Sequence, residues 1–593
     1  MTQTTERSDA GVGGGEVLSF DLTSRPWIGV LRCDGSQDEL SLRQVFAQAD
    51  DLRCVVGELA TQEFSLGRLL LAVAHDALDG PGDIEEWAEL WEDPDCFAPV
   101  EAYLEGQRER FDLVHAVAPF LQTAGLRTAK DEVFSLNRLV ADVPAGDPFF
   151  SARMPGVERL SFAEAARWVV HVHAYDTSGI KTGMVGDDRV KRGKVYPLGT
   201  GWAGGLGGVF VEGGTLRETL LLNLVSADTE GLDFTADDRP AWRREPCGPG
   251  SDGRAATGLR DLYTWQSRRV RLHHDADGVH GVVLGYGDPL ASRNAHRSEP
   301  MTAWRRSPAQ EKKLGRSPVF LPLEHDPARS AWRGITALLA DRLEDTGGSE
   351  GPSRLRPRIL EWIARLVTEG YLSRRFLVRA RVAGVRYGTQ QSVVDEVVDD
   401  RLAMPVVLLH GQDPAYAGQA IAAAEDADRA VRALGDLAAD LARATGAEQE
   451  GPKSAARAEG FDALDQPYRG WLSDMAQTSD PFEHRHTWQR QVRQTVGRLG
   501  DRLITAAGDA AWEGRIAADT KGGSHWLNAG LADVWFRGRL ARALGNPDAS
   551  SSPSSPNSDE SGTVSVDDDA APGPAPTGPT GTEHAATDPE VHV

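Results

Sequence analysis

The stretch YAGQAIAAAEDADRAVRALGDLAADLARA, residues 416–444, is rich in alanine, leucine and arginine, and its apolar residues recur with the period of an α-helix. Four other segments share this composition and are separated by polar or Gly- and Pro-containing breaks: 396–409, 461–477, 484–507 and 529–544. Segments of this number and length suit an antiparallel bundle with an inner stripe of Leu, Val and Ala. The sequence therefore predicts a helical bundle over residues 376–545.

The part of the chain before the bundle, residues 17–375, mixes helix and strand signals. An apolar run at 27–31 followed by an Asp-Gly pair predicts two strands joined by a hairpin turn. Residues 257–335 alternate short strand-like runs with turn residues. Helical periods are expected over 41–77, 84–111 and 161–174, where Ser161 and Glu164 form a capping box. The predicted fold class is α+β, with a mixed α/β domain first and a helical bundle second.

The two ends of the chain differ from the rest in composition. Residues 1–16 are glycine-rich and are predicted to form a flexible leader. Residues 546–593 hold nine Asp or Glu and no Lys or Arg, among many Ser, Pro, Gly and Thr, and are predicted to form a disordered acidic tail. The formal net charge of −24 argues against strong binding to free nucleic acid. A nucleic-acid-binding role would therefore need a partner to supply most of the phosphate contacts.

Cysteine usage and hydropathy point to the cytoplasm. The four cysteines are scattered without CxxC spacing, so neither a disulfide framework nor a zinc knuckle is supported. The first residues carry acidic side chains and no apolar core of a signal peptide, and no run of eighteen apolar residues occurs. We expect a soluble cytoplasmic protein that makes no contact with a membrane.

A glycine-rich segment, residues 176–223, carries the strongest functional signal. It holds twelve glycines in 48 residues and, between them, five basic side chains: Lys181, Arg189, Lys191, Arg192 and Lys194. Glycine permits close approach of a backbone, and interspersed cations suggest an anionic partner such as phosphate. The spacing matches neither a P-loop nor a dinucleotide-binding fingerprint in a βαβ context. Nucleic-acid contact is one reading, and a flexible surface loop is the other.

No arrangement of residues in the sequence supports catalysis or a resident metal. His171 and His173 lie two apart on a helical segment and so face different sides, and His273-His274 lacks a third ligand at metal spacing. The Gly-x-Ser-x-Gly nucleophile elbow is absent. We therefore expect a binding protein, not an enzyme, with no cofactor.

Short sequence words in a fixed order give the chain a family resemblance. They are FDLT at 20–23 with PWI at 26–28, PFLQT at 119–123, TSGIK at 177–181, GGLGG at 204–208, LLLN at 220–223, EPMTAW at 299–304 and YGTQQS at 387–392. In this order, ahead of a helical bundle, they resemble the CasA family, the large subunits of the type I-E CRISPR Cascade complex, in its actinobacterial form. The resemblance covers about residues 17–545.

The resemblance implies an α/β N-terminal domain of unusual fold, a C-terminal four-helix bundle and no catalytic activity. It implies a subunit that recognises the protospacer-adjacent motif in double-stranded DNA, largely from the minor groove, and starts strand separation. The minor groove is narrow, so a glycine-bearing loop can enter where bulky side chains cannot. The implied partners are the CRISPR guide RNA, target double-stranded DNA, other Cascade subunits and a trans-acting helicase–nuclease that the subunit helps to recruit.

The resemblance also assigns residues to roles. The motif-reading loop falls on Gly179, Ile180, Lys181, Thr182 and Gly183, and the strand-separating wedge on Thr389, Gln390 and Gln391. The contact with the 5′ handle of the guide RNA falls on Phe149, Phe150 and Arg153. Further DNA contacts fall on Arg293 and His296, which stand in for a minor-groove lysine without a clear counterpart, and on Arg305 and Arg306. No zinc is expected, because Cys247 stands alone in its loop.

Plainer readings of the same residues remain open. Gln390-Gln391 also reads as an ordinary polar turn, Phe149-Phe150 as core, and Arg305-Arg306 as a solvated face or a subunit contact. An alternative function is a structural scaffold, in which the bundle and the glycine-rich loop serve assembly only. The sequence does not say which motif is read.

Overall fold

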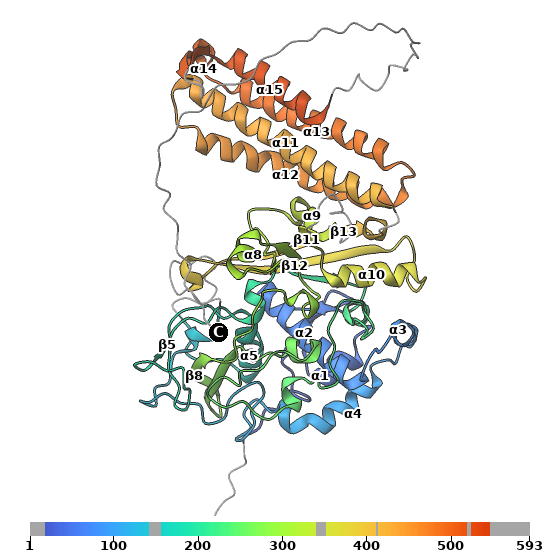
Figure 1. The fold of residues 1–593 in the computed structure, drawn as a ribbon, viewed down its shortest axis with the longest axis vertical. Helices are drawn as coiled ribbons and strands as arrows, with labels where there is room; N and C mark the ends of the chain where they lie inside the picture. Colours follow the sequence, from blue (N-terminus) through green and yellow to red (C-terminus); the bar gives the residue numbers. More distant parts are fainter. Residues whose placement is uncertain (1–17, 142–155, 340–351, 411–412, 519–522, 546–593) are drawn as a thin grey trace, which may run out of the picture.

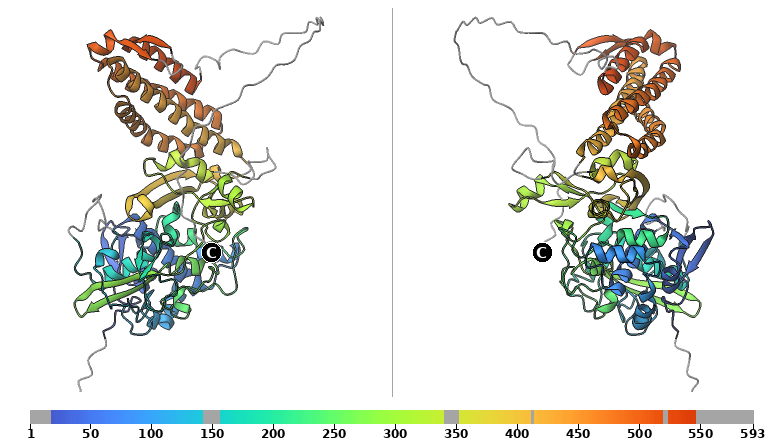
Figure 2. Two further views of the ribbon diagram at one scale, coloured as in Figure 1. Left: turned by 60° about the vertical axis from the view of Figure 1, so that its left-hand side comes forward. Right: turned by 90° about the vertical axis from the view of Figure 1, so that its right-hand side faces the viewer.

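The structure is a computed structural model and describes residues 18–141, 156–339, 352–410, 413–518 and 523–545. The fold is α+β, as predicted. Four long helices form one end of the molecule, a long β-hairpin lies beneath them, and the mixed N-terminal part lies beyond the hairpin (Figure 1). The side views show the same three levels (Figure 2).

The helices of the N-terminal part are mostly short. The predicted capping box of α5 is present, because the Ser161 hydroxyl accepts from Glu164 N and the Glu164 carboxylate accepts from Ser161 N. The helices are α1 (Leu42–Ala47), α2 (Ala60–Leu78), α3 (Ile84–Glu92), α4 (Ala98–Gln107), α5 (Phe162–Tyr175), α6 (Leu216–Asn223), α7 (Leu259–Tyr263), α8 (Pro308–Leu314), α9 (Ile335–Leu339) and α10 (Arg358–Thr368).

The strands form several small antiparallel sheets. The predicted first hairpin is present as β1 (Ile28–Arg32) and β2 (Gln37–Leu40). The other N-terminal pairs are β4 (Lys181–Thr182) with β5 (Lys194–Val195), β7 (Arg268–Asp275) with β8 (Gly278–Tyr286), and β9 (Trp304–Arg306) between β10 (Phe320–Pro322) and β11 (Arg354–Leu355).

One part of the predicted helix over residues 41–77 is wrong. β3 (Leu52–Val55) interrupts it and pairs with β1, with Val55 opposite Val30. The partner strand lies about twenty residues earlier in the chain, and its hydrogen bonds outweigh the local helical preference of these residues. The second half of this predicted helix is correct, because α2 runs through it and buries Leu69, Leu70 and Leu71.

The predicted helix over residues 396–409 is also wrong, because most of it lies in the long strand β13 (Val394–Pro405). β13 pairs with β12 (Leu377–Tyr387) from Leu377 opposite Pro405 to Tyr387 opposite Val394. β12 also pairs with β6 (Gly208–Glu212), which gives a three-stranded sheet in the order β13-β12-β6. Val398, Leu402 and Met404 are buried on one face of β13, a spacing that satisfies the two-residue period of a strand.

The C-terminal helices begin at Pro414, so β12 and β13 both fall within the range 376–545 although they form a sheet with β6 of the N-terminal part. The four long helices are α11 (Pro414–Thr445), α12 (Glu450–Asp474), α13 (Pro481–Thr505) and α15 (Ala529–Leu544). Between the last two lie α14 (Asp509–Glu513) and the hairpin of β14 (Arg515–Ala518) and β15 (Ser524–Leu527). Buried alanines such as Ala420, Ala423 and Ala427 let neighbouring helices approach α11 closely.

Aromatic and charged residues join the bundle to the central sheet. The Trp332 ring stacks on Tyr468 of α12 with centroids 4.5 Å apart, and its Nε1 donates to Asp465 at 2.8 Å. Arg469 of α12 forms an ion pair of 2.9 Å with Asp400 of β13. The apolar core runs without a break from the central sheet into the bundle. The helices are therefore packed on the sheet as one continuous core.

Candidate nucleic-acid interface

The glycine-bearing loop, residues 176–199, follows the end of α5 at Tyr175, and one buried guanidinium holds its two ends. Arg268 of β7 is 2% exposed and forms an ion pair with the Asp176 carboxylate. It also donates to the carbonyl oxygens of Asp176 at 3.1 Å, Thr177 at 3.2 Å and Gly199 at 3.0 Å. Both ends of the loop are thus bound to the same side chain of a neighbouring strand.

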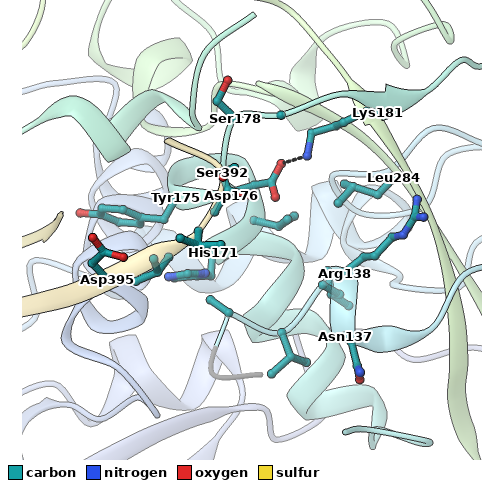
Figure 3. A pocket seen from close by; sticks show the side chains of 18 of the residues that line it. Asn137, Arg138, His171, Tyr175, Asp176, Ser178, Lys181, Leu284, Ser392 and Asp395 are labelled. Carbon is teal, nitrogen blue, oxygen red and sulfur yellow. Dashed lines mark ion pairs between the residues drawn. The ribbon is translucent and has the colours of Figure 1, made fainter. Parts of the chain in front are cut away.

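Lys181 lies against the base of the loop. Its Nζ is 2.7 Å from Asp176 Oδ2, and the side chain is only 13% exposed (Figure 3). Burial lowers the pKa of Lys181, and Asp176 offsets part of this effect. Burial alone would raise the pKa of Asp176, but Lys181 and Arg268 outweigh it and hold the pKa below its ordinary value. The ammonium assigned to DNA contact is therefore neutralised within the protein.

Tyr286, at the end of β8, holds the turn of the loop. Its hydroxyl donates to Gly179 O at 2.6 Å and accepts from Gly179 N at 3.1 Å. The ring lies beneath two cations, with Arg268 Cζ 4.8 Å and Lys181 Nζ 5.3 Å from its centroid. Sequence reasoning missed Tyr286 and Arg268, because nothing in their neighbourhood indicates a partner about a hundred residues away in the chain.

Gly179 and Gly183, the two ends of the predicted motif-reading segment, differ in their surroundings. Gly179 has a φ of +146°, and a Cβ built on it would meet no atom within 4 Å. A Cβ on Gly183 would lie 2.6 Å from Val190 Cγ1, and Gly183 N donates to Gly193 O at 2.9 Å. Gly179 and the 58% exposed Ile180 therefore form the outer turn, whereas Gly183 packs inside the segment.

The hairpin tip between β12 and β13 carries Thr389, Gln390 and Gln391, all exposed. Gln390 and Gln391 have φ values of +56° and +55°, which non-glycine residues adopt only where the surrounding structure requires it. Gln391 O accepts from Ser178 N at 2.8 Å, and so joins the tip to the glycine-bearing loop.

A second hydrogen bond joins the hairpin to the start of the glycine-bearing loop, since Tyr387 Oη donates to Tyr175 O at 2.7 Å. The residues assigned to motif reading and to strand separation, far apart in sequence, therefore lie side by side.

A cavity of about 910 Å³ lies between these two segments. Its walls come from the glycine-bearing loop, from residues 392–396 of the hairpin and from residues 137–141, which begin inside a 3₁₀ turn (Leu136–Arg138). Figure 3 shows Arg138 and Asp395 on opposite sides of it, with the Asp176–Lys181 pair between them. The arrangement is an open, polar site next to an exposed turn and an exposed tip.

The remaining predicted residues are placed elsewhere. Phe149, Phe150 and Arg153 lie outside the described residues. Arg293 is exposed, and the His296 ring packs edge-on against Trp304 and Phe320.

Arg305 is exposed on β9, whereas the Arg306 guanidinium bonds to Glu311 at 2.6 Å. Neither these arginines nor Arg293 and His296 line the cavity.

One cluster in the described part of the chain has the composition of a metal site. Donor atoms of Cys247, Asp252 and Asp288 lie within 4.8 Å of one another. However, the Arg269 guanidinium is 2.8 Å from Asp288 Oδ2 and supplies the positive charge. Burial raises the pKa of the Cys247 thiol to about 11, so the thiolate that a metal prefers is disfavoured. The cluster is better described as a buried ion pair.

None of the described helices combines the length and the apolar character needed to cross a membrane.

Comparison with known proteins gives consistent results. The model of the family "CRISPR-associated protein Cse1" matches residues 21–499. The crystal structure of Thermobifida fusca Cse1 is 55% identical with a TM-score of 0.82, over 89% of this chain and 98% of that chain. CasA/Cse1 of Thermus thermophilus is 30% identical over 338 residues, 55% of this chain and 61% of that protein, so the match spans less than two thirds of this relative.

A chain of a structure described as a CRISPR RNA-guided surveillance complex shares the fold, with a TM-score of 0.59 at 20% identity, over 82% of this chain and 99% of that chain. The family match covers most of the present chain and includes both the glycine-bearing loop and the hairpin tip. The chain therefore belongs to the Cse1 family of CRISPR-associated proteins.

Proposed function

We propose that this protein is a non-catalytic subunit of a type I-E CRISPR surveillance complex, Cascade, and that it recognises the protospacer-adjacent motif in double-stranded DNA. Membership of the Cse1 family supports a role in the complex. The observation that carries the finer proposal is the bond from Ser178 N to Gln391 O. It sets an exposed glycine turn and an exposed hairpin tip side by side, so one duplex can meet both.

The outer turn of the glycine-bearing loop suits the minor groove because Gly179 has no side chain. Gly179 offers backbone without a Cβ, and no neighbouring atom crowds it. The exposed Ile180 next to it is an apolar residue of the kind that minor-groove proteins press against base steps. Arg268 and Tyr286 hold the backbone of this turn in place, which reduces the entropy lost when it binds.

The tip suits strand separation. Gln390 and Gln391 present amide side chains at the end of a long hairpin whose other end is packed on the core. A side chain inserted beside the motif offsets part of the few kcal/mol needed to unstack a base step, and so helps guide pairing to start. The bond to Ser178 links the tip to the loop that would read the motif.

The charge distribution argues that the subunit acts within a larger assembly. The net charge is −24, and Lys181 is neutralised by Asp176. Most phosphate contacts would come from the guide RNA complex and its other subunits. Residues Phe149, Phe150 and Arg153 are proposed to contact the guide RNA handle, and Arg293, His296, Arg305 and Arg306 to lie near DNA or a neighbouring subunit. Recruitment of a trans-acting helicase–nuclease belongs to the same proposal.

The decisive experiment compares reconstituted complexes with and without this subunit in a gel shift against duplexes that carry a randomised motif. We expect the complete complex to retain a small set of motifs and the incomplete complex to show no selection. Equal selection by both complexes would contradict the proposal. If the subunit only changes the amount of complex that assembles, it is a scaffold.

A further inference from the structure

We propose that the cavity between the glycine-bearing loop and the hairpin tip holds one unpaired nucleotide of the opened DNA, with Arg138 as its main contact. The inference rests on the proposed function, because it assigns a ligand to the same site. A cavity of about 910 Å³ lies within the range of pockets that enclose small ligands. Its position directly beside the tip places it where strands would part.

Arg138 forms no ion pair with a carboxylate of the described residues, and only the electrostatic effect of Glu132 partly offsets the lowering of its pKa by burial. It makes no hydrogen bond or ion pair with any described residue, yet its Cζ lies 3.6 Å from the centroid of the Phe134 ring. A guanidinium plane backed by a phenyl ring is a surface on which an unstacked base can lie. The fork of N–H donors also matches a phosphate group.

The other charges around the cavity are largely compensated. Asp176 is paired with Lys181 and Arg268, while Glu396 is paired with Arg386 at 3.6 Å. The positive charge of Arg138 contributes to lowering the pKa of Lys181, so these two cations face the same space. Among the described residues that line the cavity, two charged side chains have no ion-pair partner: Arg138 and, on the hairpin side, Asp395.

The Arg138 guanidinium and the Asp395 carboxylate together would orient a nucleotide in the cavity. An ionised carboxylate accepts hydrogen bonds and repels phosphate, so Asp395 would face N–H groups on the edge of a base. Arg138, on the opposite side of the cavity, would hold the phosphate or the face of the base (Figure 3). Capture of one extruded base would offset part of the cost of unpairing it, as in enzymes that flip bases.

The test uses the complete complex, assembled with guide RNA, and photo-crosslinking. Target duplexes carry 4-thiothymidine at single positions beside the motif on either strand, and a separate guide carries 4-thiouridine at its 5′ end. We expect one DNA position to crosslink to peptides containing residues 134–141 or 392–396. In Arg138→Ala that crosslink should fall about tenfold, in line with the loss of one stacked base.

Arg127→Ala is the matched control, because Arg127 is exposed and bonded to Asp131 at 3.4 Å, and its crosslink yield should stay unchanged. Capture of the closed duplex should survive in Arg138→Ala, since the loop and tip are intact. Crosslinks from the guide end alone, or a DNA crosslink insensitive to Arg138→Ala, would overturn the proposal. Failure of the wild-type complex to select motifs, measured before irradiation, would instead overturn the proposed function on which it rests.

Discussion

Replacing Tyr286 by phenylalanine removes a single oxygen atom and releases the turn of the glycine-bearing loop. The hydroxyl makes two hydrogen bonds to Gly179, of 2.6 and 3.1 Å. The ring, which is buried beneath Arg268 and Lys181, would remain. We therefore expect Tyr286→Phe to loosen the loop without opening the core.

The size of the effect follows from these two bonds. A neutral hydrogen bond contributes roughly 1 kcal/mol net. The loss of both therefore destabilises the ordered conformation of the loop by up to about 2 kcal/mol. If only the ordered loop binds the motif, the affinity falls by the same free energy, up to about thirtyfold. The melting temperature of the subunit should fall by less than about 5 °C, because the chain is large.

The assay is the affinity of the reconstituted complex for a duplex with the preferred motif and for one without it. The ratio of the two affinities should fall in Tyr286→Phe, while the salt dependence stays the same because no phosphate contact is lost. Tyr263→Phe is a matched control: Arg68 covers its ring at 4.5 Å, but its hydroxyl has no hydrogen-bond partner among the residues that the structure describes. An unchanged affinity ratio in Tyr286→Phe would refute the reasoning.

Three further predictions follow from the same structure. The double variant Gln390→Gly and Gln391→Gly keeps the positive φ angles but removes both amides, so it should slow opening of a closed duplex and not of one with a bubble beside the motif. Gly183→Ala should cost about 1–3 kcal/mol in the free energy of unfolding, because its Cβ would overlap a neighbouring side chain. Burial lowers the pKa of His171 to about 3 and of His173 to about 4. Stability should therefore be constant above pH 6.5 and fall by about 2 kcal/mol per histidine at pH 5, as acid-dependent denaturant unfolding would reveal.

Each of these predictions has its own contrary outcome. Equal defects of the double variant on both duplexes would remove the wedge assignment. Gly205→Ala is the control for Gly183→Ala, since a Cβ there meets nothing within 4 Å, and equal destabilisation by both would refute the packing argument. A stability that does not change between pH 6.5 and 5 would mean that His171 and His173 are not buried in their neutral form.

Local signals in the sequence determined much of the secondary structure. The helical period of residues 416–444 predicted α11, and the capping box of Ser161 and Glu164 marked the start of α5. The Asp-Gly turn predicted the first hairpin. These features depend on residues within a few positions of one another, so the sequence alone contains the information. The family resemblance indicated which segments form the candidate site.

Tertiary structure decided what depends on distant partners. Residues 396–409 carry a pattern compatible with a helix, yet β12 provides the hydrogen bonds that make most of them a strand. Lys181 reads as a free cation, and only its burial against Asp176 neutralises it. Tyr387 reaches the carbonyl of Tyr175 across 212 residues of sequence, and so seats the hairpin tip against the glycine-bearing loop. Such contacts form because the fold excludes water from buried polar groups, which then need one another as partners, and no local pattern specifies which partner each group will find.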